Sequence, residues 1–158
     1  MAIEKVKEYF KNFDIEDKVI ELEESSATVE LAAEALGTKP ERIAKTLSFM
    51  VNDKPILIVM AGDTKIDNSK YKLEFNTKAC MIDRDKVEEL IGHGVGGVCP
   101  FGINPCVDVY LDESLKRFET VFPACGSAKS AIELTIPEME KYSNYVKWID
   151  VGKNIENN

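Results

Sequence analysis

Apolar and polar residues follow each other along the chain in patterns that predict several short helices. Ile3, Val6 and Phe10 fall on one stripe of a helix, with Lys and Glu residues between them. Thr28 can cap a second helix, and Gly37 can end it in a left-handed conformation. Helices are predicted over residues 2–12, 29–36, 68–74, 83–91 and 137–142.

Two neighbouring apolar segments predict the centre of a β-sheet. Residues 45–51 alternate, so that Lys45 shares one side with Leu47, Phe49 and Val51. Residues 55–61 are almost continuously apolar, as in a strand buried on both faces, and a polar turn joins the two segments into an antiparallel hairpin. Further strands are predicted over residues 19–22, 79–82, 107–111, 120–122 and 131–136. The expected class is α+β, with one mixed, largely antiparallel sheet that curls like a barrel among surrounding helices.

The length of 158 residues predicts a single domain over residues 1–151 and a frayed tail over residues 152–158. Hydrophobic residues make up 44% of the chain and charged residues 30%, as is ordinary for a soluble globular protein. No apolar run is long enough to cross a bilayer, and the N-terminus lacks the apolar region of a signal peptide. We therefore expect a cytoplasmic protein that makes no membrane contact.

The net charge of −8 argues against broad affinity for DNA or RNA, because neutralising phosphates requires clustered Lys and Arg. The charge is unevenly distributed, however. Residues 39–78 hold eight basic and five acidic side chains, a balance of +3, which leaves −11 for the remainder. This segment either forms a local basic face or is simply a solvated surface.

Metal and disulfide chemistry are not indicated. The four cysteines form no Cys-x-x-Cys pair, and there is one histidine. We expect free thiols, no metal site and no cofactor.

Five of the nine glycines lie within residues 91–102, a segment that also contains Pro100. Such a cluster indicates either a tight irregular turn or a shaped loop whose unpaired amides can bind an electron-rich ligand atom. Lys45 has two interpretations as well, a lysine that reaches out at the edge of a strand or a fixed cation that faces a pocket. Together, a cation and a row of amide donors would make a site for an anion or a polarised carbonyl.

Other residues carry weaker signals. His93 has no orienting carboxylate nearby in the sequence, and a histidine in a loop is often simply solvated. Cys99 and Cys125 are candidate nucleophiles without a recognisable partner, so that small buried apolar residues are the alternative. Asp108 points away from the apolar face of its strand, and Ser127 lies in a turn of small residues.

Several separated motifs resemble those of the YbaK/prolyl-tRNA-synthetase-associated editing domain family, and they occur in the family's order over about residues 25–140. They are residues 32–37 (AAEALG), 42–47 (RIAKTL), 96–102 (GGVCPFG), 107–112 (VDVYLD), 118–127 (FETVFPACGS) and 132–134 (IEL).

The resemblance implies a deacylase that acts in trans and hydrolyses the ester of a mischarged tRNA, with tRNA(Pro) carrying a small wrong amino acid such as cysteine as the expected substrate. It implies catalytic roles for Lys45, Gly96 and Gly97. It further implies substrate binding by Thr46, Val98, Cys99, Pro100, Phe101, Gly126 and Ser127. The implied partners are the acceptor end of tRNA and prolyl-tRNA synthetase.

The amino acid removed is left open. Relatives that clear alanine usually carry Asn after the lysine, where this chain has Thr46, and a late histidine that this chain lacks. Relatives that clear cysteine often have a Gly-Lys-Arg-Gly-like run where residues 126–129 read GSAK. Two other classes remain as alternatives. One is a non-catalytic module that binds an aminoacyl-tRNA end or a small ligand. The other is a thiol-redox protein that uses Cys99 or Cys125.

Overall fold

The computed structural model describes residues 2–23 and 28–154. Its helices are α1 (Ala2–Lys11), α2 (Val29–Leu36), α3 (Asn68–Phe75), α4 (Arg84–Ile91) and α5 (Ile136–Ser143), with 3-10 helices η1 (Glu16–Lys18), η2 (Pro40–Arg42) and η3 (Glu113–Arg117). Its strands are β1 (Ile20–Glu21), β2 (Ile43–Val51), β3 (Lys54–Ala61), β4 (Thr64–Ile66), β5 (Asp108–Asp112), β6 (Thr120–Pro123), β7 (Ser130–Ala131), β8 (Leu134–Thr135), β9 (Lys147–Ile149) and β10 (Gly152–Asn154).

All five predicted helices are present, each within one residue of the predicted ends. Local signals set these ends. The Thr28 hydroxyl accepts a hydrogen bond from the amide of Leu31 at 3.1 Å, and Gly37 ends α2 with φ of 68°. The Asp67 carboxylate caps α3 by accepting hydrogen bonds from the amides of Ser69 and Lys70.

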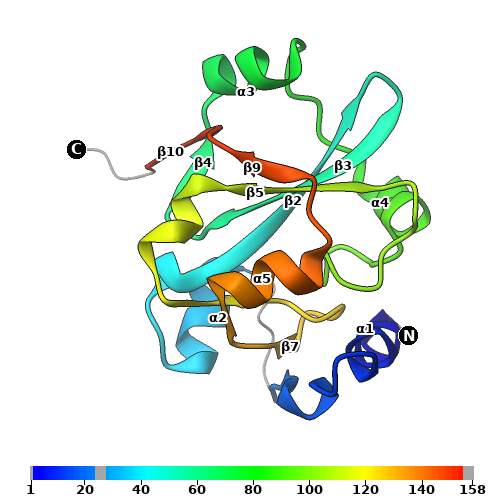
Figure 1. The fold of residues 1–158 in the computed structure, drawn as a ribbon, viewed down its shortest axis with the longest axis vertical. Helices are drawn as coiled ribbons and strands as arrows, with labels where there is room; N and C mark the ends of the chain where they lie inside the picture. The colour runs from blue at the N-terminus through cyan, green and yellow to red at the C-terminus, as the bar shows by residue number, and fades with distance from the viewer. Residues whose placement is uncertain (1, 24–27, 155–158) are drawn as a thin grey trace.

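Six strands form one sheet in the order β8-β6-β2-β3-β5-β9 (Figure 1). Its centre is the predicted hairpin of β2 and β3, in which Ala44 pairs with Ala61 and Val51 with Lys54. Asn52 and Asp53 form the turn with φ of 50° and 69°, left-handed conformations that suit a two-residue hairpin loop. β6, β5 and β9 join as parallel strands, so the sheet is mixed, as the sequence predicts.

The chain departs from the sequence predictions in three segments. Residues 79–82 form no strand, only a bridge between Met81 and Phe49. The strand predicted over 131–136 is divided between β7, which pairs with β1, and β8, which pairs with β6. Residues 152–154 are not frayed as predicted but form β10, which pairs with β4. Burial of Val151 and Gly152 keeps this segment packed against the rest of the protein. Residues 155–158 lie outside the described part of the chain.

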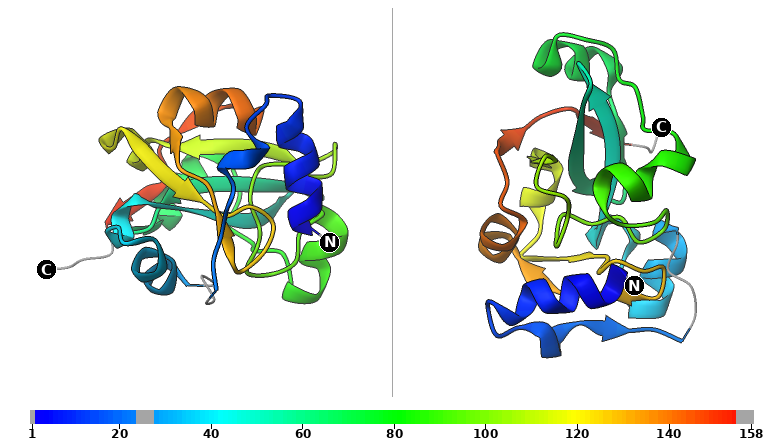
Figure 2. Two further views of the ribbon diagram at one scale, coloured as in Figure 1. Left: turned by 90° about the horizontal axis from the view of Figure 1, so that it is seen from below. Right: turned by 90° about the vertical axis from the view of Figure 1, so that its right-hand side faces the viewer.

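Alternate residues of β3 face two separate apolar clusters. Leu57, Val59 and Ala61 join the larger cluster, to which α1, α4 and α5 contribute. Ile56, Ile58 and Met60 join the smaller one, which α3 covers. Both views of Figure 2 place α5 on one side of the strands and α2 and α4 on the other. Burial on both faces makes the hairpin of β2 and β3 a rigid support for side chains at its edge.

Candidate functional site

The edge of β2 is partly unpaired. β6 pairs with β2 only at Ile43 and Ala44. Further along the same edge, the backbone of residues 80–82 hydrogen bonds to Ser48 and Met50. Between these two contacts, no strand of the described chain covers residues 45–47 on this side. An open strand edge leaves room for a ligand.

A cavity of about 350 Å³ opens at this edge. Its walls come from β2, from α2, from the start of α4, from β6 and β7, and from residues 91–102, which we call the glycine loop. Lys45, Thr46, Gly96 and Val98 are the predicted site residues that line it. The hydroxyl of Thr46 is buried and has no hydrogen-bond partner in the described part of the chain.

Lys45 lies on the face of β2 that the alternation predicts, at the end of the apolar row of Leu47, Phe49 and Val51. Its ammonium donates to the carbonyl of Gly62 at 3.5 Å. Burial lowers the pKa of Lys45, and the nearby carboxylates of Asp63 and Glu30 act in the opposite direction. The side chain is thus a partly desolvated cation at the wall of a cavity, in accord with the second of its two interpretations.

Close packing fixes the carbonyl that receives the Lys45 ammonium. A Cβ atom at Gly62 would lie 2.1 Å from the carbonyl oxygen of Pro40 and 2.7 Å from a methyl carbon of Val29. Only glycine allows the turn between β3 and β4 to approach α2 and η2 this closely. The acceptor for Lys45 is therefore held by backbone contacts.

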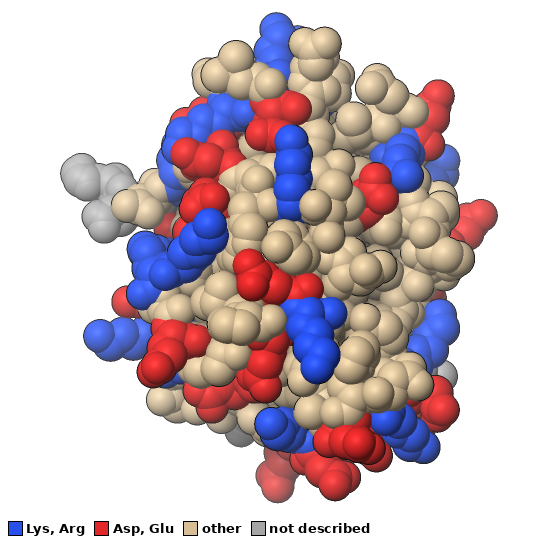
Figure 3. Space-filling model, in the orientation of Figure 1, with Lys and Arg blue, Asp and Glu red and all other residues tan. Residues whose placement is uncertain are grey.

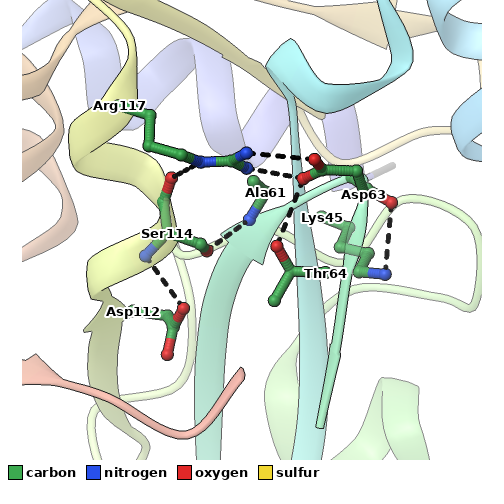
Figure 4. Close-up of polar contacts among 8 residues, drawn as sticks. Lys45, Ala61, Asp63, Thr64, Asp112, Ser114 and Arg117 are labelled. Atoms are coloured by element: carbon green, nitrogen blue, oxygen red, sulfur yellow. Dashed lines mark hydrogen bonds and ion pairs between the residues drawn. The ribbon is translucent and has the colours of Figure 1, made fainter. Parts of the chain in front are cut away.

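An ion pair and two hydrogen bonds hold the same turn from the other side (Figure 4). The guanidinium of Arg117 donates to both carboxylate oxygens of Asp63, at 3.0 and 2.5 Å. The Ser114 hydroxyl accepts from the amide of Ala61 at 3.0 Å, and the Asp112 carboxylate accepts from the amide of Ser114. Hydrogen bonding to Arg117 keeps the pKa of Asp63 below its usual value, so this carboxylate stays charged.

The glycine loop contacts Gly126 and Ser127, which are also predicted site residues. A Cβ atom at Gly97 would lie 2.4 to 2.6 Å from backbone atoms of Gly126 and Ser127. The amide of Gly97 donates to the carbonyl of Gly94, whereas the amides of Gly96 and Val98 have no partner in the described chain. Both residues line the cavity, as does Val95 of the same loop, whose amide likewise has no partner in the described chain.

The remaining predicted site residues do not line the cavity. Gly97, Gly126 and Ser127 support the loop from behind, and the Ser127 hydroxyl donates to the hydroxyl of Ser130, a cavity residue, at 2.9 Å. The other three are buried in the interior: Cys99, Pro100 and Phe101. Their substrate-binding role stays a prediction, and the structure allows them to act only by shaping the loop.

The candidate thiols are poor nucleophiles. Burial raises the pKa of Cys99 to about 12 and that of Cys125 well above its usual value. The reactive form of a cysteine is the thiolate, which neither residue populates at neutral pH. Both are packed in the main apolar cluster, as the alternative interpretation of the sequence expects.

His93 is not solvated, in contrast to the usual expectation for a loop histidine. Its side chain is fully buried, and Nε2 lies 2.6 Å from the carbonyl oxygen of Phe101. This bond ties the two ends of the glycine loop together. Asp108 lies outside the cavity, at the start of β5, where it forms an ion pair with Lys54.

The cavity also has lining residues that the sequence did not single out. Arg84 and Met81 line the cavity on the side of α4, Val29 and Ala32 line it on α2, and Ser48 lines it on β2. Only a helix stripe on α2 and the alternation of β2 could have indicated the last three. Among the residues that the structure describes, no group of three or more His, Cys, Asp or Glu side chains could hold a metal ion. Within the same ranges, no helix is both long and apolar enough to span a bilayer.

The basic excess of residues 39–78 is not a single patch. Arg42, Lys54 and Lys70 each pair with an acidic side chain from another part of the chain. Figure 3 shows basic and acidic side chains interspersed over one face of the molecule. Any contact with a polyanion must therefore depend on individual unpaired cations.

Comparison with known proteins identifies relatives of the whole chain. The model of a family described as aminoacyl-tRNA editing domain matches residues 23–142. The uncharacterized protein YwhH of Bacillus subtilis (strain 168) is 53% identical over 157 residues, which cover 99% of this chain and 100% of that protein. The proline–tRNA ligase of Geobacillus sp. (strain WCH70) is 27% identical over 101 residues, which are 63% of this chain but 18% of the ligase.

A solved structure described as a candidate trans-editing enzyme for prolyl tRNA synthetase superposes on this chain with a TM-score of 0.86 and 26% identity. The superposition covers 97% of this chain and 98% of the other. The α+β class and the curled mixed sheet predicted from the sequence are thereby confirmed.

Proposed function

Because the chain belongs to the aminoacyl-tRNA editing domain family, we propose that it is a deacylase that acts in trans on mischarged tRNA. The substrate that we propose is tRNA(Pro) carrying a small wrong amino acid such as cysteine, and the partner is prolyl-tRNA synthetase. The main support is that Lys45, Gly96 and Val98 line one cavity of about 350 Å³, and that the amides of Gly96 and Val98 have no hydrogen-bond partner in the described chain. That volume lies in the range of small-molecule sites, about 300 to 1,000 Å³.

In the proposed reaction, the ester carbonyl lies between the Lys45 ammonium and the amides of Gly96 and Val98. A water molecule attacks the carbonyl carbon, and negative charge develops on the carbonyl oxygen. Fixed donors and a cation in a partly dry cavity stabilise that charge. The bond to the ribose oxygen then breaks, the ribose oxygen takes a proton, and the products are a free amino acid and uncharged tRNA.

No protein nucleophile is part of this proposal. Cys99 and Cys125 are buried away from the cavity with raised pKa values. When the amino acid is cysteine, its own thiol is a second candidate for the attacking group; the bond to the ribose oxygen then breaks to release a cyclic thioester, which water hydrolyses to the free amino acid. Gly97 and Gly126 contribute by holding the loop in place, and the supporting observation is the close approach of their backbones.

The walls of the cavity suit a small side chain. Thr46, Ser48 and Ser130 provide hydroxyl groups, while Ala32 and Leu36 of α2 are apolar. This mixture supports cysteine, serine, threonine and alanine as the set to test.

The experiment is a deacylation assay with Cys-tRNA(Pro), Ala-tRNA(Pro), Ser-tRNA and Thr-tRNA, with charged tRNA in large excess over protein. We expect multiple turnovers with at least one substrate and a loss of about 100-fold in kcat/KM for Lys45→Ala. Lys54→Ala is the matched control, since Lys54 lies at the start of the partner strand and pairs with Asp108 outside the cavity. Full activity of Lys45→Ala would remove Lys45 from the mechanism.

The same assay separates the deacylase from a non-catalytic binding module. Binding of charged tRNA without turnover of any substrate would identify a module that holds the acceptor end without cleaving it. In that case Lys45→Ala would weaken binding and leave the ester intact.

A further inference from the structure

Arginine is the side chain best suited to bind phosphate, and this chain has three arginines. Arg42 pairs with Glu133, and Arg117 pairs with Asp63. Arg84 forms no side-chain hydrogen bond or ion pair within residues 2–23 and 28–154. It is exposed, and it lines the mouth of the cavity that contains Lys45.

A second hollow lies one segment away along the chain. It has a volume of about 430 Å³, and its lining includes Lys72 on α3 and Lys78 in the segment that follows. Neither lysine forms an ion pair in the described part of the chain. Residues 79–83 connect this hollow to Arg84, with Ala79 lining the second hollow and Met81 the cavity.

All three side chains are exposed and follow one another along the chain, from Lys72 on α3 to Arg84 at the start of α4. Lys78 and Arg84 are six residues apart, which corresponds to at most about 20 Å of extended chain. The flanking carboxylates of Asp83 and Asp85 form no ion pair with Arg84. The chain as a whole carries a net charge of −8, which repels a polyanion, so exposed cations that have no acidic partner in the described chain would orient it at the cavity.

We propose that Arg84, Lys78 and Lys72 bind phosphates of the single-stranded 3′ end of the substrate RNA. This inference rests on the proposed function for the identity of the cavity's occupant. Arg84 takes the phosphate next to the terminal nucleoside, because it alone of the three lines the cavity. Its planar guanidinium can donate two parallel hydrogen bonds to one phosphate group. The lysines act as point charges further along the strand.

The test compares substrates with and without phosphates. One substrate is aminoacyl-tRNA, and the other is the aminoacyl ester of adenosine, which has no phosphate group. For Arg84→Ala we expect KM for aminoacyl-tRNA to rise about three- to tenfold with little change in kcat, and hydrolysis of the adenosine ester to be unchanged. Arg84→Lys should recover part of the loss, because it keeps the charge but not the fork of donors.

Binding is measured separately, by fluorescence anisotropy of an RNA hairpin with a single-stranded CCA 3′ end at several salt concentrations. Arg84→Ala should weaken binding and reduce the slope of log K against log salt by about 0.7, as expected for one lost phosphate contact on a single strand. The double change Lys72→Ala with Lys78→Ala should reduce the slope by about twice as much. Lys86→Ala is the matched control, since Lys86 lies on the same helix, is exposed and does not line the cavity.

The outcomes are distinguishable from those of the proposed function. If Arg84→Ala binds the hairpin with the affinity and salt slope of the wild-type protein, the proposal that Arg84 binds a phosphate is wrong, whatever the deacylation assay gives. If the wild-type protein cleaves no charged tRNA but its binding of the hairpin depends on Arg84, the proposed phosphate binding is supported and the deacylase proposal fails. A rise in KM that also appears with the adenosine ester would overturn the assignment to phosphate.

Discussion

Arg117 holds Asp63 through two parallel hydrogen bonds of 3.0 and 2.5 Å, and Asp63 directly follows the glycine whose carbonyl receives the Lys45 ammonium. The ion pair therefore keeps the Asp63 carboxylate bound to the guanidinium and not to the Lys45 ammonium. With Arg117 in place, the carboxylate is bound by the guanidinium and by the neighbouring Thr64 hydroxyl. Without it, the same carboxylate would be free to turn toward the ammonium.

Arg117→Ala is expected to reduce deacylation by about tenfold, because an unpaired Asp63 would attract Lys45 away from the substrate. The loss of stability should stay below about 1 kcal/mol, since the pair is partly exposed to solvent. The measurements are kcat/KM and the midpoint of urea unfolding. Lys116→Ala is the control, because Lys116 is an exposed neighbour that pairs with Glu113 instead.

A second variant distinguishes positioning from general damage. Combining Arg117→Ala with Asp63→Asn removes both charges and should restore part of the activity that Arg117→Ala loses. The pH profile should also shift, since removing Asp63 removes the carboxylate that raises the pKa of Lys45 most strongly. Equal activity of the single and double variants would show that the ion pair has no effect on Lys45.

Gly97→Ala is expected to destabilise the protein by about 1 to 3 kcal/mol, as in an overpacked interior, because its Cβ would lie 2.4 Å from the backbone of Gly126. Gly94→Ala is the matched control in the same loop. The nearest atom to a Cβ there is a flexible carboxylate oxygen of Glu88, at 3.8 Å. We expect Gly94→Ala to change the free energy of unfolding by less than about 0.5 kcal/mol. Urea unfolding of the three proteins provides the comparison, and equal costs for the two variants would contradict it.

His93 should make stability depend on pH. Burial lowers its pKa, its bond to the Phe101 carbonyl partly opposes this shift, and the nearby ammonium of Lys5 adds to the lowering. In the native state the ring resists protonation, so the unfolded chain binds more protons as the pH falls below the ordinary histidine pKa of about 6.5. Stability is then complete above that pH and decreases below it, by at most about 1.4 kcal/mol per pH unit.

The measurement is urea unfolding at pH 7.5 and pH 5.5 for the wild-type protein and His93→Asn. The variant should lose stability at both pH values and show a smaller difference between them. A wild-type protein that is equally stable at the two pH values would mean that His93 titrates alike in the folded and unfolded chains.

The thiols should divide into two classes. Cys80 and Cys106 are exposed, whereas Cys99 and Cys125 are buried with raised pKa values. A colorimetric thiol reagent should therefore modify two of the four cysteines rapidly in the native protein and all four in urea. Full activity after replacement of both Cys99 and Cys125 by Ser would exclude an activity that depends on either thiol. Rapid modification of Cys99 in the native protein would contradict the burial described here.

Local interactions explain what could be predicted from the sequence alone. The cap at Thr28, the stop at Gly37 and the cap at Asp67 act within four residues of the chain, so their signals are complete in a short stretch of sequence. The hairpin turn at Asn52 and Asp53 is equally local. Alternation along β2 likewise indicates the face of Lys45 without reference to any partner strand.

Only the tertiary structure decided which distant segments meet. Strands β4, β9 and β10 have three residues each, too few for a periodic pattern, and their pairing depends on neighbours far away in the sequence. Gly97 contacts Gly126, and Arg117 contacts Asp63. In each pair, the type of one residue does not indicate which distant residue it will contact. Residue types and spacing thus determined the helices, the hairpin and the family resemblance. Long-range packing decided that Lys45, the loop residues Gly96 and Val98, and Arg84 line one cavity.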